Sequence, residues 1–184
     1  MDLGHILSGP DNDSHMLDKI PSRVLCPACR SRIDKTYYRK EFQPKKPHFD
    51  FSFTYDGYCI VSRRFQEFCI RNEYPGLDFH SLGDGSFFWF MPRSTVRFDA
   101  KKRQTRFENF CSACNQYAVV VGATPGFLVE EHPLPDGFYV TDIEFGDRTE
   151  KSPLYIVGVE TQRKLKREKM KGLQFEPIQK STPG

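Results

Sequence analysis

The stretch FENFCSACNQYAVVVG, residues 107 to 122, places two cysteines two residues apart between apolar segments with the character of strands. A second Cys-x-x-Cys lies far upstream in VLCPACRSR, residues 24 to 32. Each pair alone fits three interpretations: half of a metal site, a redox pair, or two small core residues. The fold therefore depends on whether the two pairs meet in space.

The composition is that of a folded protein. The 184 residues are 38% hydrophobic, 14% aromatic and 28% charged, and a chain of this length buries most of its unfolded surface. The formal charge of +3 is too small for the whole surface to bind a polyanion, so nucleic-acid binding would need a local basic patch. The N-terminus lacks the pattern of a signal peptide, and nowhere do about eighteen apolar residues run together. We therefore expect a cytoplasmic protein with reduced cysteines.

Hydrophobic periodicity in the first half predicts two strands, a helix and a third strand. Alternating aromatic residues predict a strand over 49–55, and Asp56-Gly57 suits a tight turn into a returning strand over 58–61. Ser62 is a candidate N-cap for a short amphipathic helix that stops at Pro75-Gly76. The extended segment GLDFHSL follows.

The same order of elements then occurs again. YIVGVETQRKLKREKMKGLQFEPI aligns with YCIVSRRFQEFCIRNEYPGLDFHSL so that matched residues lie 96 positions apart. The matches are Ile60 with Ile156, Val61 with Val157, Cys69 with Leu165, Gly76-Leu77 with Gly172-Leu173, and Phe79 with Phe175. Asp50 and Phe53 match Asp142 and Phe145 at an offset of 92, and the cysteine pairs match at 85. This pattern indicates an internal duplication, and the alternative is two ordinary α+β segments whose turn signals coincide.

These segments predict an α+β fold with a mainly antiparallel sheet, zinc-ribbon-like cysteine knuckles and two similar strand-strand-helix-strand halves. In the region between the halves, Pro92 would separate two strands and Asp99 to Arg103 would form a polar turn. The predicted boundaries are a flexible leader, 1–20; one globular domain, 21–178, with halves 24–82 and 107–178 and a connecting hairpin, 86–106; and a tail, 179–184.

The two cysteine pairs together supply the four thiolates of a closed structural zinc site: Cys26, Cys29, Cys111 and Cys114. The spacing of two lets both sulfurs of one turn reach the same ion while backbone N–H groups point at them. Pro27 suits the geometry of the first turn. In many such knuckles a left-handed glycine follows the second cysteine, and here Arg30 and Asn115 take that position.

Two alternatives remain open for these cysteines: a vestigial site with free thiols, and thiol–disulfide redox chemistry. A redox pair normally lies at the N-terminus of a helix, whereas NQYAVVVG after Cys114 is a poor helix start. Cys59 and Cys69 fall on apolar faces and are expected in the core. The five histidines have no metal-binding or catalytic spacing, and we predict no catalytic residue.

Charged residues are segregated along the chain. The basic stretch 163–171 lies towards a predicted helix C-terminus, and the basic stretch 97–106 is expected at an exposed hairpin tip. Acidic residues concentrate between Glu130 and Glu150. A surface of this kind can steer a protein partner.

The assembled pattern resembles the double-CxxCG-motif immunity proteins of Sit-type contact-dependent toxin systems and related polymorphic-toxin families. The resemblance covers roughly residues 24–178 and is most specific in the cysteine pairs and in the closing GLQFEPI, while the glycine after each pair is missing. It implies a non-enzymatic bacterial protein that binds and neutralises a cognate toxin. The main alternative is a zinc-ribbon nucleic-acid-binding or regulatory protein, suggested by the basic stretches and by FFWF, 87–90, of which at least two residues should be core.

Overall fold

The computed structural model describes residues 2–18 and 20–180 and confirms an α+β fold in which antiparallel pairing dominates. The small sheet contains, in spatial order, β2 (Phe51–Phe53), β3 (Cys59–Ser62), β5 (Phe87–Pro92) and β4 (Leu77–Leu82). The large sheet contains, in spatial order, β7 (Arg106–Cys111), β8 (Gln116–Val121), β10 (Phe138–Asp147), β11 (Ser152–Val157), β1 (Gly4–Ser8), β12 (Gln174–Lys180) and β9 (Phe127–Leu128), and β6 (Thr95–Val96) pairs with β10.

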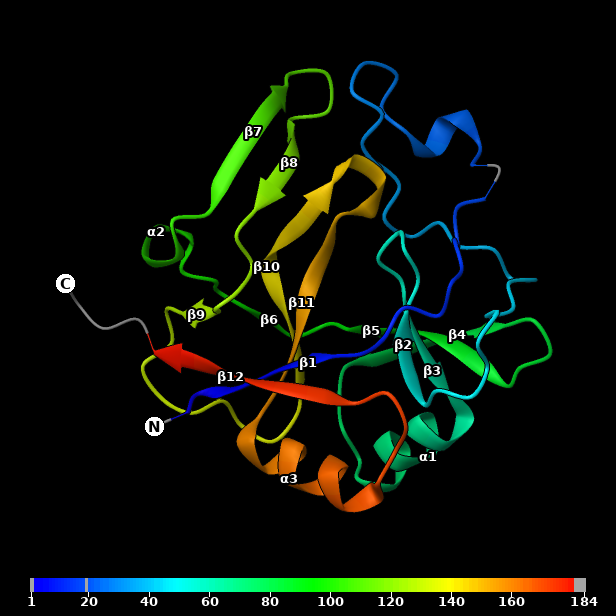
Figure 1. The fold of residues 1–184 in the computed structure, drawn as a ribbon, viewed down its shortest axis with the longest axis vertical. Coiled ribbons are helices and arrows are strands. Elements are labelled where there is room, and N and C mark those ends of the chain that lie inside the picture. Colours follow the sequence, from blue (N-terminus) through cyan, green and yellow to red (C-terminus); the bar gives the residue numbers. More distant parts are fainter. Residues whose placement is uncertain (1, 19, 181–184) are drawn as a thin grey trace.

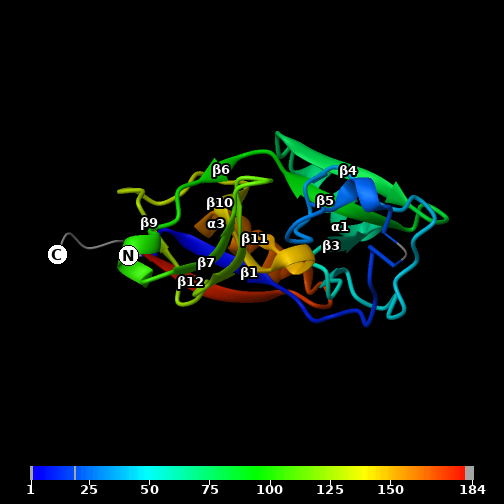
Figure 2. The same cartoon turned by 90° about the horizontal axis from the view of Figure 1, so that it is seen from above.

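The helices are α1 (Arg63–Arg71), α2 (Ala100–Arg103) and α3 (Val159–Glu168), with two 3-10 turns at Ser22–Val24 and Arg148–Glu150. Figure 1 shows the small sheet on the right, the large sheet across the centre and left, and both α1 and α3 below them. Figure 2, turned by 90°, again places the small sheet at one end of an elongated molecule and β9 near the other. Within the described residues, no helix has the length and apolar character needed to cross a membrane.

Helix α1 begins directly after Ser62, as the sequence predicts, and ends at Arg71, four residues before the predicted stop at Pro75-Gly76. The Ser62 side chain accepts a hydrogen bond from the backbone N–H of Phe65, which satisfies one of the free donors of the first turn. Phe65, Phe68 and Cys69 are buried on one face because they are spaced three and four residues apart. The side chain of Asn72 donates to the carbonyl of Phe68 and closes the last turn.

The two sheets contain the same unit, and its register matches the predicted offset of 96. In the small sheet, Ile60 and His80 both pair with Trp89 of β5. In the large sheet, Ile156 and Glu176, each 96 residues later, both pair with Ile6 of β1. Each unit therefore consists of a strand, a helix and a second strand that runs parallel to the first. In the sheet, one antiparallel strand lies between these two strands. Helix α1 contacts β5 and helix α3 contacts β1, so the helices also lie on equivalent strands.

The strand that precedes this unit does not align as predicted. Phe51 of β2 and Phe138 of β10 pair with equivalent residues of β3 and β11, so the true offset of this strand is 87. The predicted match of Asp50 with Asp142, at an offset of 92, is wrong. The register of β10 shifts after Val140, and this irregularity moves the later residues of the strand out of correspondence.

The predicted flexible leader, residues 1–20, is wrong. Gly4–Ser8 is the inner strand β1, which pairs with β11 on one side and β12 on the other. Ile6 and Leu7, which point to opposite faces of this inner strand, are both buried, and so is Leu3 directly before it. The segment therefore completes the second unit of the duplication.

The predicted connecting hairpin, 86–106, is also wrong. Strand β5 pairs with β3 and β4, whereas β7 pairs with β8, so the two strands lie in different sheets. The expected polar turn is the short helix α2, in which the Asp99 side chain accepts from the N–H of Lys102. The predicted tail, 179–184, begins inside β12, where Gln179 and Lys180 pair with β9, and residues 181–184 lie outside the described residues.

The main hydrophobic core joins the two halves. Phe51, Phe65 and Phe90 from the small sheet and α1 share one cluster with Tyr155 and Leu165 from the second unit. Ring centroids of Phe90 and Tyr155 lie 6.0 Å apart, and Tyr155 Oη donates to the carbonyl of Phe90 at 2.9 Å. A core that both halves share favours the predicted single domain over two separate ones.

Replacing Leu7 by alanine tests the correction made to the N-terminal segment. Leu7 is 1% exposed, so Leu7→Ala should lower the free energy of unfolding by about 2–5 kcal/mol in urea titrations. The control Ile70→Ala removes a side chain that is 64% exposed on α1 and should change that free energy by less than about 0.5 kcal/mol. Equal effects of the two substitutions would show that β1 is not an inner strand.

Candidate metal centre

The first cysteine pair lies in a tight turn between short extended segments. Leu25 and Arg32 form an isolated antiparallel bridge on either side of the turn. The N–H of Cys26 donates to the carbonyl of Ser31 at 2.8 Å, and the N–H of Arg30 donates to the carbonyl of Cys26 at 3.0 Å. Arg30 has a φ of 65°, the left-handed conformation predicted for the residue after the second cysteine.

The second pair occupies the equivalent turn between β7 and β8. Cys111 and Gln116 form the last pair of the hairpin, and residues 112–115 form the turn between them. Asn115 has a φ of 56° and so repeats the conformation of Arg30. Cys114 leads into strand β8, as predicted, and a redox pair at the start of a helix is not the geometry found here.

The fold brings both pairs together, although 85 residues separate them along the chain. The sulfur of Cys26 lies 3.9 Å from that of Cys111, and the sulfur of Cys29 lies 3.6 Å from that of Cys114. All four ligand atoms lie within 4.8 Å of one another. Metal–sulfur bonds of about 2.3 Å in a tetrahedron require sulfur–sulfur edges of about 3.8 Å, so the cluster has the dimensions of a four-thiolate metal site. In Figure 1 the β7–β8 turn and the blue loop of the first pair accordingly meet at the top of the molecule.

Backbone N–H groups and a hydroxyl face the sulfurs, as the knuckle prediction requires. The N–H groups of Cys29 and then Ala28 hydrogen-bond to the sulfur of Cys26 and lower its pKa. The Ser31 side chain lies 3.3 Å from the sulfur of Cys29 and is the main cause that lowers the pKa of this thiol to about 6. Removal from solvent raises the pKa of Cys114 to about 12. A metal ion would displace the remaining protons, so metal affinity should fall as the pH is lowered.

A buried lysine lies next to the cluster. Lys151 is 4% exposed, and its Nζ donates to Tyr117 O at 2.6 Å and Gln116 Oε1 at 3.2 Å. Burial lowers the pKa of Lys151, whereas the charges of Cys114 and Cys29 act in the opposite direction. A divalent ion with four thiolates carries a net charge of −2, so a protonated Lys151 would offset part of that charge.

Two further contacts attach the first knuckle to the second half of the chain. The Arg32 guanidinium donates to the carbonyl of Lys151 at 3.1 Å, and Lys35 forms an ion pair with Glu144 of β10. Our sequence reasoning missed these residues, because partners more than 100 positions away leave no local pattern. Only Arg32 had a signal, its place three residues after the first cysteine pair.

The remaining cysteines are core residues, as predicted. Cys59 and Cys69 are buried in the main core, and burial raises the pKa of both thiols well above its ordinary value. Among the described residues, no histidine joins the four cysteines as a candidate ligand. The metal ligands that the sequence predicts are therefore the four that the fold brings together.

Comparison with known proteins adds no family to this description. No family model, no curated protein and no solved structure matches the chain.

Metal loading can be checked one cysteine at a time. The protein should bind one Co²⁺ per chain with the strong sulfur-to-metal absorption of a four-thiolate site, and Cys29→Ser or Cys114→Ser should abolish that spectrum. Cys69→Ala, at a thiol outside the cluster, should retain the Co²⁺ spectrum. Full retention of the spectrum in either serine variant would contradict the assignment of the ligands.

The left-handed residues offer a test of the knuckle conformation. Arg30→Gly removes the steric cost of a side chain at positive φ and should raise the free energy of unfolding of the metal-loaded protein by about 0.5–1 kcal/mol. Asn115→Gly should give a smaller gain, because asparagine adopts this conformation more readily. Urea titration measures both changes, and destabilisation by Arg30→Gly would contradict the predicted backbone geometry.

Proposed function

We propose that the chain is a non-enzymatic immunity protein that binds a cognate bacterial toxin in the cytoplasm and is stabilised by a structural zinc ion. The observation that carries this proposal is a cluster of exposed aromatic side chains on the β7–β8 hairpin, next to the four cysteines. The resemblance in sequence pattern suggests the toxin as the partner. The geometry described below supports a role in binding rather than in catalysis.

The donor set favours zinc over other ions. Four thiolates with tetrahedral edge lengths suit Zn²⁺, which is bound in this way in many structural sites. The four sulfurs complete the coordination and leave no position for a substrate or an activated water. A zinc ion here would therefore hold the knuckles in place instead of taking part in a reaction.

The aromatic cluster has the character of a protein-binding surface. Phe107 and Phe110 are 40% and 55% exposed, and the ring of each lies within 5.3 Å of the ring of Tyr117. They stand on β7, an edge strand of the large sheet whose residues from Arg106 to Phe110 are all exposed. Exposed aromatic groups on a strand edge are costly in water unless a partner covers them.

The surroundings of the cluster indicate the charge of that partner. Lys101 and Lys102 are exposed close to the start of β7, where Arg106 forms an ion pair with Glu108 of the same strand. Interfaces commonly combine an apolar centre with a charged rim, and the rim aligns the partner by electrostatic complementarity. We therefore expect the toxin to present an apolar patch bordered by acidic residues.

Nucleic-acid binding has less support. Phe88, Trp89 and Phe90 of the FFWF run are buried, so these rings are not available for stacking on bases. In the basic helix α3, Lys164 pairs with Asp136 and Arg163 pairs with Glu160. These contacts fit the prediction of a solvated helix face.

Co-expression with the toxin tests the proposal. The protein should restore the growth of cells that express a toxin encoded next to its own gene, and it should form a one-to-one complex that persists at high salt. Phe110→Ala should weaken that complex by about thirtyfold or more in calorimetric titrations, as expected for an aromatic residue at the centre of an interface. Ile70→Ala, on the exposed face of α1, should leave the affinity unchanged.

Two results would contradict the proposal. The first is full neutralisation and unchanged affinity with Phe110→Ala, which would remove the hairpin from the interface. The second is retention on nucleic acid with a steep dependence on salt and no complex with the toxin, which would favour the nucleic-acid alternative.

A further inference from the structure

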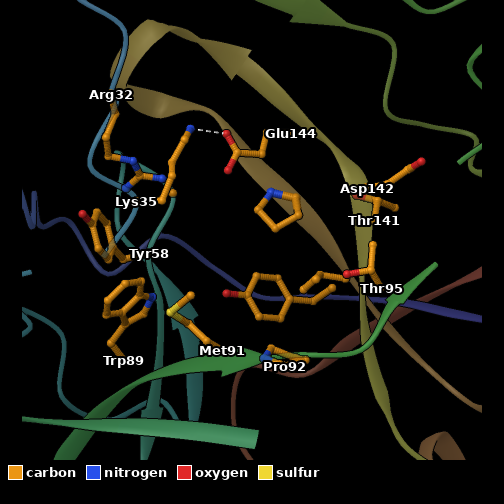
Figure 3. Close-up of a pocket in the computed structure, with 14 residues that line it drawn as sticks. Arg32, Lys35, Tyr58, Trp89, Met91, Pro92, Thr95, Thr141, Asp142 and Glu144 are labelled. Atoms are coloured by element: carbon orange, nitrogen blue, oxygen red, sulfur yellow. Dashed lines mark hydrogen bonds and ion pairs between the residues drawn. The ribbon is translucent and has the colours of Figure 1, made fainter. Parts of the chain in front are cut away.

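A cavity of about 470 Å³ lies between the small sheet, the large sheet and the segment that follows the first knuckle. Strand β5 contributes Trp89, Met91 and Pro92 to its walls, and β10 and β11 contribute residues on the opposite side. Figure 3 shows Arg32 and Tyr58 on one wall and the ion pair of Lys35 with Glu144 across the top. A cavity of this size can accommodate a small organic molecule.

Arg32 is the unusual group in this cavity. It is only 6% exposed, and its guanidinium lies 4.7 Å from the centre of the Tyr58 ring. One nitrogen, Nη2, donates to the carbonyl of Lys151, whereas Nε is buried and has no hydrogen-bond partner. In the part of the chain that the structure describes, no carboxylate forms an ion pair with Arg32. A buried cation without a counter-ion is costly, and an anion in the cavity would remove that cost.

The other charged side chains of the cavity have partners of their own. Lys35 is paired with Glu144. Asp142 accepts a hydrogen bond from the N–H of Phe98, and in Figure 3 its side chain points away from the cavity. Arg32 is therefore the cation of the cavity lining that lacks a carboxylate partner, and a ligand with a single negative charge would supply one. A carboxylate meets this need, because it carries one charge and its two oxygens match the planar guanidinium.

The remaining walls select an apolar, flat ligand body. The side chains of Trp89, Tyr155 and Met91 line the cavity with Pro92 and Pro153. Aromatic and proline faces offer flat surfaces on which a planar ring can stack. From the unpaired Arg32 and these apolar walls we infer that the cavity binds a small aromatic or conjugated carboxylic acid, with its carboxylate at Arg32. This site is separate from the proposed toxin-binding hairpin and does not depend on it.

Trp89 provides a direct readout, because it is the only tryptophan in the sequence. Its indole N–H gives one signal in a ¹H–¹⁵N spectrum. Titration with 2-naphthoate should shift this signal saturably with a Kd of about 1 mM or tighter. The neutral analogue 2-naphthamide should bind at least about tenfold more weakly, because it lacks the charge that pairs with Arg32.

Three variants complete the experiment. Arg32→Met should bring the affinities for the acid and the amide within about twofold of each other. Val140→Phe should fill the cavity and abolish binding of both, and Arg167→Met, at an exposed position on α3, should leave both affinities unchanged. Metal content measured in each sample separates loss of the ligand site from loss of the adjacent metal centre. If Arg32→Met does not fold, the comparison of acid with amide in the unmodified protein decides the question.

Two results would overturn the inference. One is the absence of saturable binding of 2-naphthoate up to several times the expected Kd of about 1 mM. The other is equal affinity for the acid and the amide in the unmodified protein.

Discussion

The contacts between Cys26 and Cys111 and between Cys29 and Cys114 join segments 85 residues apart, and much of the neighbouring structure depends on them. Residues 20–48 contain little regular secondary structure, and the β7–β8 hairpin pairs with β10 through only Val119 and Val120. Neither segment is firmly held by backbone hydrogen bonds alone. The proposed metal ion would fix both at once, since its binding free energy is gained only when all four thiolates converge.

The same constraint positions the two surfaces to which we assign functions. The aromatic cluster stands on the hairpin that ends in Cys111 and Cys114, and Arg32 follows Cys29 by three residues. Loss of the metal should therefore disturb the proposed partner surface and the proposed ligand cavity together, although neither touches the ion. In this account the thiolates act as scaffold, and the chemistry of recognition lies in the residues that they hold.

The sequence was sufficient to predict those features of the fold and the site whose signals are local or repeated. The four ligands follow from two Cys-x-x-Cys pairs, helix α1 from Ser62 and the spacing of its aromatic residues, and the duplicated unit from an offset that the strand register reproduces. The strand β1, which is inserted into the second unit, could not be found in this way. Strand β1 has only five residues, is buried on both faces and pairs with residues about 150 to 170 positions away. Likewise Lys151 and Glu144 carry no local pattern, and only the tertiary fold brings them to the knuckle.

Hydrogen–deuterium exchange with and without a metal chelator tests the central claim, that one metal ion holds both knuckles in place. We predict that chelation accelerates exchange in residues 24–35 and 106–121 together, while β1, β11 and β12 keep their protection because the shared core holds them. Unchanged exchange in both knuckles, or acceleration confined to one of them, would contradict it.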